Sequence, residues 1–317
     1  MKNYQKPNPD LWTGRSSEKQ LYMHEKIRCI TLEESTLLTI NGKSFAFLGY
    51  ECDEGVKRNQ GRVGAVEGPN AIRKMLSSLS NHFSEEVSIL DVGNITCKDH
   101  YLEETQYETT DSIALLLKHK MFPMVLGGGH DLGYAHYNGI KKQFPNKTIG
   151  IINLDAHFDL RETIDRGTSG TPFYQIAKAH DSFQYLCLGI QKESNHRELF
   201  NRADQLQVKY LYNTEFTIQN KEKVAQTVSE FIATVDLVYL TMDIDGFSSA
   251  YAPGVSAPSP LGFSIDIAMQ TIQLICESKK MISADIVELN PKYDLDNCTA
   301  RLAARIAYNI MIWLSVE

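Results

Sequence analysis

The chain has 317 residues, of which 43% are hydrophobic and 22% are charged, and its formal net charge is −7. This length and composition are typical of one large globular α/β domain. The acidic balance, together with the lack of any run of Lys or Arg, argues against a nucleic-acid partner. No apolar stretch reaches the length of a membrane span, so we expect no membrane association.

The first 15 residues contain no apolar segment, so we expect no secretory signal. The six cysteines form no C-x-x-C pair, and several lie in apolar runs. This usage indicates free or buried thiols in a reducing compartment, and not a disulfide framework or a cysteine-bound zinc. We therefore expect a cytoplasmic protein.

Eight short apolar runs, rich in Val, Ile and Leu, predict β-strands. They lie at 45–50, 87–93, 123–128, 148–155, 185–190, 207–212, 237–243 and 282–289. Continuous apolar runs of this kind are typical of strands that are covered on both faces, as in a parallel sheet. Amphipathic segments between the runs predict helices, at 68–80, 103–120, 220–235, 264–278 and 296–313.

The alternation of strand and helix predicts a three-layer α/β/α fold with a doubly wound, mainly parallel sheet of about eight strands. No shift in composition marks a linker. We expect one catalytic domain over residues 41–317, preceded by an N-terminal extension over residues 1–40 that wraps the sheet edge.

Ionisable side chains follow four of the predicted strands, at the point where each strand ends. They are His130, Asp155, His157, Asp159, Asp243, Asp245 and Glu288. Because ligands of such sheets bind outside the carboxyl ends of the strands, we expect these side chains to form one site. The three glycines before His130 permit a tight turn.

Two His and four Asp are too many ligands for a structural zinc site. Mixed carboxylate and imidazole ligands favour Mn²⁺, with Fe, Co and Zn as alternatives. Six ligands serve two metals if some carboxylates bridge, and two metals about 3.5–4 Å apart lower the pKa of a shared water toward about 7. Each motif alone also has a plainer explanation, namely a solvated loop, a turn with a helix cap, a salt-bridge network or an ordinary strand-end carboxylate.

Four motifs, "GGGHD", "NLDAHFD", "LTMDIDGFSSAYAPGVSAPSPLGFS" and "DIVELNP", resemble those of the ureohydrolase family, which includes arginase, agmatinase and formimidoylglutamase. The resemblance covers residues 45 to 310 and implies an arginase-like fold, a homo-oligomer and a centre of two Mn²⁺ ions. One ion would be bound by His130, Asp155, Asp159 and Asp243, and the other by Asp155, His157, Asp243 and Asp245.

The family chemistry implied by the resemblance is attack of a metal-bridging hydroxide on an amidine-type carbon. Asp159 would orient this nucleophile or accept its proton, and Glu288 would meet the cationic head of the substrate. The segments "LWTGR", "DEGVKRNQGRVGAVEGPNAIR", "FDLRETIDRGTSGTPFYQIA" and "LGIQKESN" resemble formimidoylglutamases in particular. They imply hydrolysis of N-formimidoyl-L-glutamate to L-glutamate and formamide, a step of histidine breakdown.

Arg161 follows Asp159 by two residues and should lie at the rim of the site, where its guanidinium would suit a substrate with two carboxylates. Arg58 and Arg62 are further candidates for carboxylate binding, with surface charge near a helix start as the alternative. Ser169 stands where agmatinases carry a proposed proton-shuttle His. The shuttle is therefore absent, or Ser169 acts through water, or another residue replaces it. We expect His136 on a helix face and outside the chemistry.

Three other functions share part of this sequence pattern. Another ureohydrolase activity, on a guanidino acid, agmatine or arginine, is the nearest alternative. A non-catalytic metal-binding paralogue is suggested by Ser169, although all six ligands are present. Zinc deacetylases share a related fold but keep only one of the two metal sites, so the full ligand set argues against that class.

Overall fold

The computed structural model describes residues 1–40 and 42–316. Their centre is a ten-stranded sheet in the order β1-β4-β3-β5-β10-β9-β6-β7-β8, with β2 also paired to β4. All the pairings between these strands are parallel except that of β1 with β4. The strands are Tyr4–Gln5 (β1), Arg28–Cys29 (β2), Ser44–Glu51 (β3), Ser88–Thr96 (β4), Phe122–Leu126 (β5), Ile149–Leu154 (β6), Gln184–Ile190 (β7), Lys209–Tyr212 (β8), Leu237–Asp243 (β9) and Met281–Val287 (β10).

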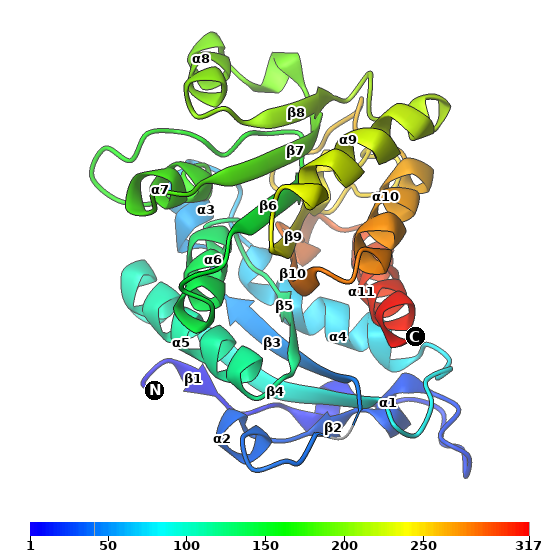
Figure 1. Ribbon diagram of the computed structural model, residues 1–317. Coiled ribbons are helices and arrows are strands. Elements are labelled where there is room, and N and C mark those ends of the chain that lie inside the picture. Colours follow the sequence, from blue (N-terminus) through cyan, green and yellow to red (C-terminus); the bar gives the residue numbers. More distant parts are fainter. Residues whose placement is uncertain (41, 317) are drawn as a thin grey trace.

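Helices connect the strands and cover both faces of the sheet, as Figure 1 shows. Helices α5, α6 and α7 pack side by side on one face, and α4, α9, α10 and α11 pack on the other. The helices are Met23–Lys26 (α1), Leu32–Ser35 (α2), Glu54–Arg58 (α3), Gly68–Ser77 (α4), Leu102–Lys118 (α5), Leu132–Gln143 (α6), Pro172–Ala179 (α7), Arg197–Gln205 (α8), Lys221–Ala233 (α9), Ile265–Glu277 (α10) and Cys298–Ser315 (α11).

Successive residues of each central strand are buried against opposite helix layers. In β3, Phe45 and Phe47 belong to the core beneath α4, α10 and α11, whereas Ala46 and Leu48 belong to the core beneath α5 and α6. Side chains alternate across a strand, so a strand covered on both faces needs apolar residues at every position. This explains the continuous apolar runs in the sequence.

The N-terminal segment lies against β4 at one edge of the sheet. Both β1 and β2 pair with β4, on the side that β3 leaves open. Trp12, in the segment "LWTGR", donates its indole N–H to Oδ2 of Asp91 at 2.7 Å, and Oδ1 of Asp91 accepts from Arg73 of α4 at 2.9 Å. The segment is thus joined to the sheet and to a helix, and the domain boundary at residue 40 stays a prediction.

The predicted fold class is confirmed, with all eight predicted strands and all five predicted helices present. The two strands that sequence patterns missed, β1 and β2, have two residues each and exist through their pairing with β4. Within the described residues, no helix combines the length and the apolar character that crossing a membrane requires.

Candidate metal centre and substrate pocket

The predicted site residues lie at the carboxyl ends of four neighbouring strands in the middle of the sheet, β5, β10, β9 and β6. Because parallel strands end at the same edge, the residues that follow them meet in one place. The predicted metal ligands are His130 after β5, Asp155, His157 and Asp159 after β6, and Asp243 and Asp245 at the end of β9, and the predicted catalytic residue Glu288 follows β10.

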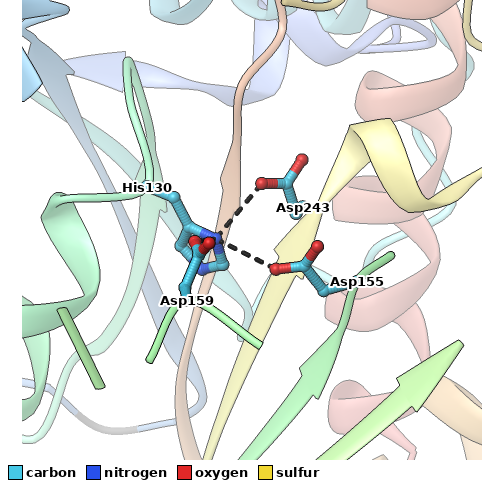
Figure 2. Close-up of side chains that lie close together, drawn as sticks. All are labelled: His130, Asp155, Asp159 and Asp243. Carbon is cyan, nitrogen blue, oxygen red and sulfur yellow. Dashed lines mark ion pairs between the residues drawn. The ribbon is translucent and has the colours of Figure 1, made fainter. Parts of the chain in front are cut away.

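His130 is the centre of the first group of ligands, which Figure 2 shows. Its Nδ1 atom lies 3.3 Å from Oδ2 of Asp155, 3.0 Å from Oδ2 of Asp159 and 3.1 Å from Oδ2 of Asp243. One ligand atom from each of these four residues lies within 4.8 Å of the others. Three carboxylates therefore converge on one imidazole nitrogen.

A second group of ligands consists of Asp155, His157 and Asp245, again with their ligand atoms within 4.8 Å of one another. Nδ1 of His157 lies 3.4 Å from Oδ1 of Asp155 and 3.5 Å from Oδ1 of Asp245. Asp155 therefore serves both groups, with Oδ2 toward His130 and Oδ1 toward His157. Asp243 is not part of this second group, and its Oδ1 accepts the backbone N–H of Asp245 at 2.9 Å, so its predicted place in the second ligand set stays a prediction.

The glycine turn after β5 brings His130 close to the end of β3. The backbone N–H groups of Gly128 and Gly129 donate to the carbonyls of Tyr50 and Cys52, at 2.8 and 2.9 Å. A Cβ atom on Gly128 would lie only 1.9 Å from the Cys52 carbonyl oxygen, so a larger residue does not fit. The turn needs glycine because two backbones meet there.

Two site residues adopt left-handed backbone conformations that L-residues rarely occupy, Asp159 with φ 49° and Glu288 with φ 65°. Such conformations cost of order 1–3 kcal/mol each and persist where the surrounding structure holds them in place. They aim both carboxylates at the centre, since Asp159 approaches His130 and Glu288 accepts the His130 backbone N–H at 2.9 Å.

Electrostatics at the centre are dominated by buried negative charge. Burial raises the pKa of Asp243 well above its usual value, and the nearby charge of Asp245 raises it further. Burial also raises the pKa of Glu288 to about 8. Burial alone would lower the pKa of His130. The hydrogen bonds to the carboxylates of Asp155, Asp159 and Asp243 have a larger, opposite effect, so the pKa of His130 lies well above its usual range. Together these shifts indicate that the site attracts cations.

The residues present fit a centre of two divalent cations. Nδ1 of His130 and Oδ1 of Asp245 are buried without a hydrogen-bond partner in the described part of the chain. Nδ1 of His130 nevertheless lies close to the carboxylate of Asp243, and Oδ1 of Asp245 lies close to the imidazole of His157. Burying carboxylates so close together is costly unless a cation compensates them. Imidazole nitrogen and carboxylate oxygen are ligands that suit divalent first-row metals, and Asp155 is placed to bridge two of them.

A cavity of about 280 Å³ opens onto this centre, large enough for a small molecule. It is lined by Val56, Asn59, Gln60, Gly61, Arg62, His157, Asp159, Arg161, Ser169, Ser194, Asn195, Leu199, Asp243, Asp245, Ser256, Ala257 and Glu288. Four predicted metal ligands, both predicted catalytic residues and three of the four predicted substrate-binding residues are therefore brought together in one pocket.

The arginines predicted to bind carboxylate differ in their surroundings. Arg161 is exposed in the pocket, and its guanidinium forms no hydrogen bond or ion pair with any described residue. Arg62 also lines the pocket, but its guanidinium donates to the carbonyls of Ser256 and Val255, at 2.8 and 2.6 Å, and stacks 4.0 Å over the ring of Tyr293. Arg161 is thus the arginine that is free for a ligand.

Arg58 does not line the pocket. Its guanidinium contacts Glu103 at 2.6 Å and Glu54 at 3.2 Å, and it also donates to the Gly167 carbonyl. These contacts tie α3 to the start of α5 and to the loop before α7. The sequence allowed two roles for Arg58, either binding a substrate carboxylate or serving as a surface charge near a helix start. The contacts of Arg58 with Glu103 and Glu54 favour the second role.

Several residues that support the site were not found from the sequence. Asn195 accepts the Phe158 backbone N–H through Oδ1 and donates to the Ala156 carbonyl, so it holds the segment that carries His157. Thr241 lies 3.0 Å from Nε2 of His130. The sequence does hint at Thr241, because it lies two residues before Asp243 and its side chain is therefore on the same face of the strand.

Comparison with known proteins places this geometry in a family. The model of the arginase family matches residues 43–313. A formimidoylglutamase of Clostridium tetani is 40% identical over 325 residues, which cover 98% of this chain and 96% of the relative. A formimidoylglutamase of Geobacillus kaustophilus is also 40% identical, over 314 residues that cover 98% and 97% of the two chains.

Solved structures agree with these sequence matches. The crystal structure of Trypanosoma cruzi formiminoglutamase with Mn²⁺₂ superposes with a TM-score of 0.79 at 26% identity, over 91% of this chain and 99% of that chain. The crystal structure of formimidoylglutamase from Bacillus subtilis has a TM-score of 0.84 at 21% identity, over 96% and 95% of the two chains, and shares the fold. The chain belongs to the arginase family.

Proposed function

We propose that this protein is a hydrolase that converts N-formimidoyl-L-glutamate to L-glutamate and formamide, with two Mn²⁺ ions at the centre described above. Relatives that are 40% identical over nearly the full chain carry the name formimidoylglutamase, which supports the reaction. The observation that carries the choice of substrate is Arg161, whose guanidinium has no partner among the described residues and lies in the same pocket as the carboxyl groups of Asp159, Asp243, Asp245 and Glu288.

Substrate charge is the reason that Arg161 matters. Formimidoylglutamate has two carboxylates, which the anionic metal ligands and Glu288 would repel without a cation to receive them. A guanidinium presents parallel N–H donors that match a carboxylate in a fork geometry. Arginine and guanidino acids have one carboxylate and agmatine has none, so a free arginine in the pocket favours the dicarboxylate.

The reaction breaks the bond between the formimidoyl carbon and the glutamate nitrogen. Water adds its oxygen to that carbon, the glutamate nitrogen leaves with one proton as an amine, and the carbon leaves as formamide. When bound, the two ions would supply a water that is acidic enough to act as nucleophile near neutral pH. Asp159, with its carboxylate at the pocket, would orient this water or accept its proton. Glu288, buried beside it, would bind the cationic amidine.

Ser169 has a defined orientation in the pocket. Its Oγ accepts a hydrogen bond from Nδ2 of Asn59 at 3.2 Å, which leaves the hydroxyl proton of Ser169 free to donate. This supports a role for Ser169 as a donor to the substrate where agmatinases carry a histidine. A formimidoyl group has one nitrogen fewer than a guanidino group, and in both reactions the nitrogen that leaves as the amine must gain a proton.

The cellular setting follows from the same proposal. Manganese suits the mixed carboxylate and imidazole ligands. The six cysteines are all free, which fits a reducing cytoplasm. We also propose a homo-oligomer and a place in histidine breakdown, where formimidoylglutamate arises. Size-exclusion chromatography with light scattering tests the oligomer.

A substrate panel tests the reaction. The Mn²⁺-loaded protein is assayed with formimidoylglutamate, arginine, agmatine and a guanidino acid, with ammonia, urea, formamide and amine measured separately. We expect formamide and glutamate from the first substrate at the highest kcat/KM. Faster urea release from any guanidine would replace the proposed substrate, and no turnover of any amidine would favour a non-catalytic metal-binding protein.

A further inference from the structure

We propose that Thr241 and Asp285 are positioning residues that hold the His130 imidazole with its Nδ1 lone pair toward the three carboxylates of the metal centre. This inference rests on the proposed metal centre, and it assigns a task to buried polar residues that the chemistry above does not use. The residues lie below the ligands, inside the sheet, on β9 and β10.

A chain of hydrogen bonds leads from His130 into the sheet. Nε2 of His130 lies 3.0 Å from Oγ1 of Thr241, and that hydroxyl donates to Oδ1 of Asp285 at 2.6 Å. Thr241 and Asp285 are paired in register across β9 and β10. All three residues are at most 1% exposed, so water does not compete for these bonds.

The direction of each bond follows from counting protons. The hydroxyl of Thr241 donates to Oδ1 of Asp285, and it has only this one proton to donate. Oγ1 of Thr241 can then only accept from His130, which places the ring proton of His130 on Nε2. Nδ1, which lies 3.0–3.3 Å from the three carboxylates, is then the nitrogen that would offer its lone pair to a bound metal. A metal ligand needs this tautomer.

The other oxygen of Asp285 is also held in place. Oδ2 accepts from the Tyr239 hydroxyl and lies 2.6 Å from Nδ1 of His136. Nε2 of His136 faces the hydroxyl of Ser283, whose proton goes to the Pro123 carbonyl at 3.0 Å. Both nitrogens of His136 therefore face side-chain oxygens, Nδ1 that of Asp285 and Nε2 that of Ser283.

The contact between His136 and Asp285 accounts for two buried polar residues that lie outside the pocket. His136 is buried in α6 and faces Asp285, away from the chemistry, as expected for a residue outside the catalytic set. Asp285 stands inside an apolar strand, where its two oxygens lie within hydrogen-bond distance of the side chains of Tyr239, Thr241 and His136. A fixed carboxylate prevents the Thr241 hydroxyl from turning toward His130, so the histidine cannot take the opposite tautomer.

Two substitutions at position 241 test the proposal. Thr241→Val keeps the shape of the side chain but removes the acceptor for Nε2, and Thr241→Ser is the matched control that keeps the hydroxyl. We expect Thr241→Val to weaken Mn²⁺ binding at the His130 group by about 10- to 100-fold, as for lost partners of ligating histidines elsewhere. Thr241→Ser should stay within about threefold of the parent protein.

Mn²⁺ affinities are measured by electron paramagnetic resonance of the free ion, with circular dichroism as the check on folding. Equal affinities of Thr241→Val and the parent protein would overturn the proposal. If the parent and Thr241→Ser bind Mn²⁺, and Thr241→Val binds it weakly, the positioning role stands even when no amidine is hydrolysed. The Mn²⁺-binding experiment therefore tests the positioning role independently of the proposed hydrolase activity.

A second measurement needs no variant, and so it decides the matter even if Thr241→Val does not fold. The parent protein is labelled with ¹⁵N-histidine and loaded with Zn²⁺, which is diamagnetic. We expect the His130 ring proton on Nε2, visible as a slowly exchanging N–H. A proton on Nδ1, or a rapidly exchanging Nε2 proton, contradicts the assignment.

Discussion

Oε1 of Glu288 accepts the backbone N–H of His130 at 2.9 Å, so the residue after β10 closes the glycine turn that follows β5. Glu288 also lines the pocket, with its pKa raised to about 8 by burial. The same carboxyl group therefore stabilises the turn that positions a proposed metal ligand, and we propose that it becomes an anion when a cationic amidine binds beside it. These two tasks make different demands on the side chain and can be separated by mutation.

Glu288→Gln should keep the turn and lose the anion. The amide oxygen of glutamine still accepts the His130 N–H, so we expect bound Mn²⁺ to stay near the parent level. Hydrogen bonds to charged groups contribute about 1.5–3 kcal/mol, so kcat/KM should fall about 10- to 100-fold. Glu288→Ala, which removes both interactions, should reduce bound metal as well. Metal analysis and steady-state kinetics check the pair, and equal metal loss in both variants would refute this division of tasks.

Arg161→Ala should raise KM for formimidoylglutamate by about 10- to 100-fold, because a charge-assisted bond of about 1.5–3 kcal/mol is lost. Its kcat should change less, since the guanidinium is proposed to bind the carboxylate end and not the reacting carbon. Arg58→Ala is the control, because Arg58 lies outside the pocket lining and pairs with Glu54 and Glu103. A KM for Arg161→Ala equal to that of Arg58→Ala would exclude Arg161 from substrate binding.

The buried pair of Arg73 and Asp91 should contribute strongly to stability. Their charged atoms lie 2.9 Å apart and both side chains are 1% exposed. Arg73→Met leaves the Asp91 charge buried with fewer donors, so we expect the free energy of unfolding to fall by about 3–5 kcal/mol. Lys147→Ala, which removes an exposed pair with Asp236, should cost about 0–1 kcal/mol. Urea unfolding compares the two, and similar losses would contradict the argument.

The reactivity of Cys97 should depend on pH in the neutral range. A hydrogen bond from the Cys52 thiol lowers the pKa of Cys97 to about 7, although burial opposes the shift. Since the thiolate is the reactive form, alkylation by iodoacetamide should increase as pH rises through about 7 and then level off. Peptide mass spectrometry at several pH values measures this rate at Cys97.

Cys52→Ala is the matched control for Cys97. Without the donor, the midpoint of the alkylation profile should move up toward the value of an ordinary thiol, about 8.5. A midpoint near that value in the parent protein would contradict the expected thiolate. Cys276 should stay unreactive in the folded chain, because burial raises its pKa to about 12.

Most of the fold was predictable because strands covered on both faces must be apolar at every position. Most of the runs that became β3 to β10 come close to this, the edge strand β8 being the most exposed, and their alternation with helices indicates parallel crossovers. By contrast, β1 and β2 have two residues each, and only their contact with β4 makes them strands. The order of the strands in the sheet also depends on contacts between distant segments, which a local pattern does not contain.

The candidate metal centre was predictable because its proposed ligands stand in motifs at strand ends, where parallel strands converge. The surroundings of single charged residues were not. Arg58 was a candidate for the pocket, but its partner Glu103 lies 45 residues further along the chain. Asp285 could have been noticed as the one charged residue in the apolar run of β10, yet its partner Thr241 comes from another strand.

The covering of β4 by the first 30 residues has a consequence for how this chain avoids aggregation. β4 is nine residues long and mostly apolar, and β1 and β2 occupy parts of its outer edge near residues 94–95 and 90–91. An open, apolar edge strand is a template on which another chain can add a strand. The N-terminal segment, which Trp12 anchors there, therefore blocks the pairing of β4 with a strand of another molecule. A shortened chain without this segment would expose the edge of β4 and pair with its own copies.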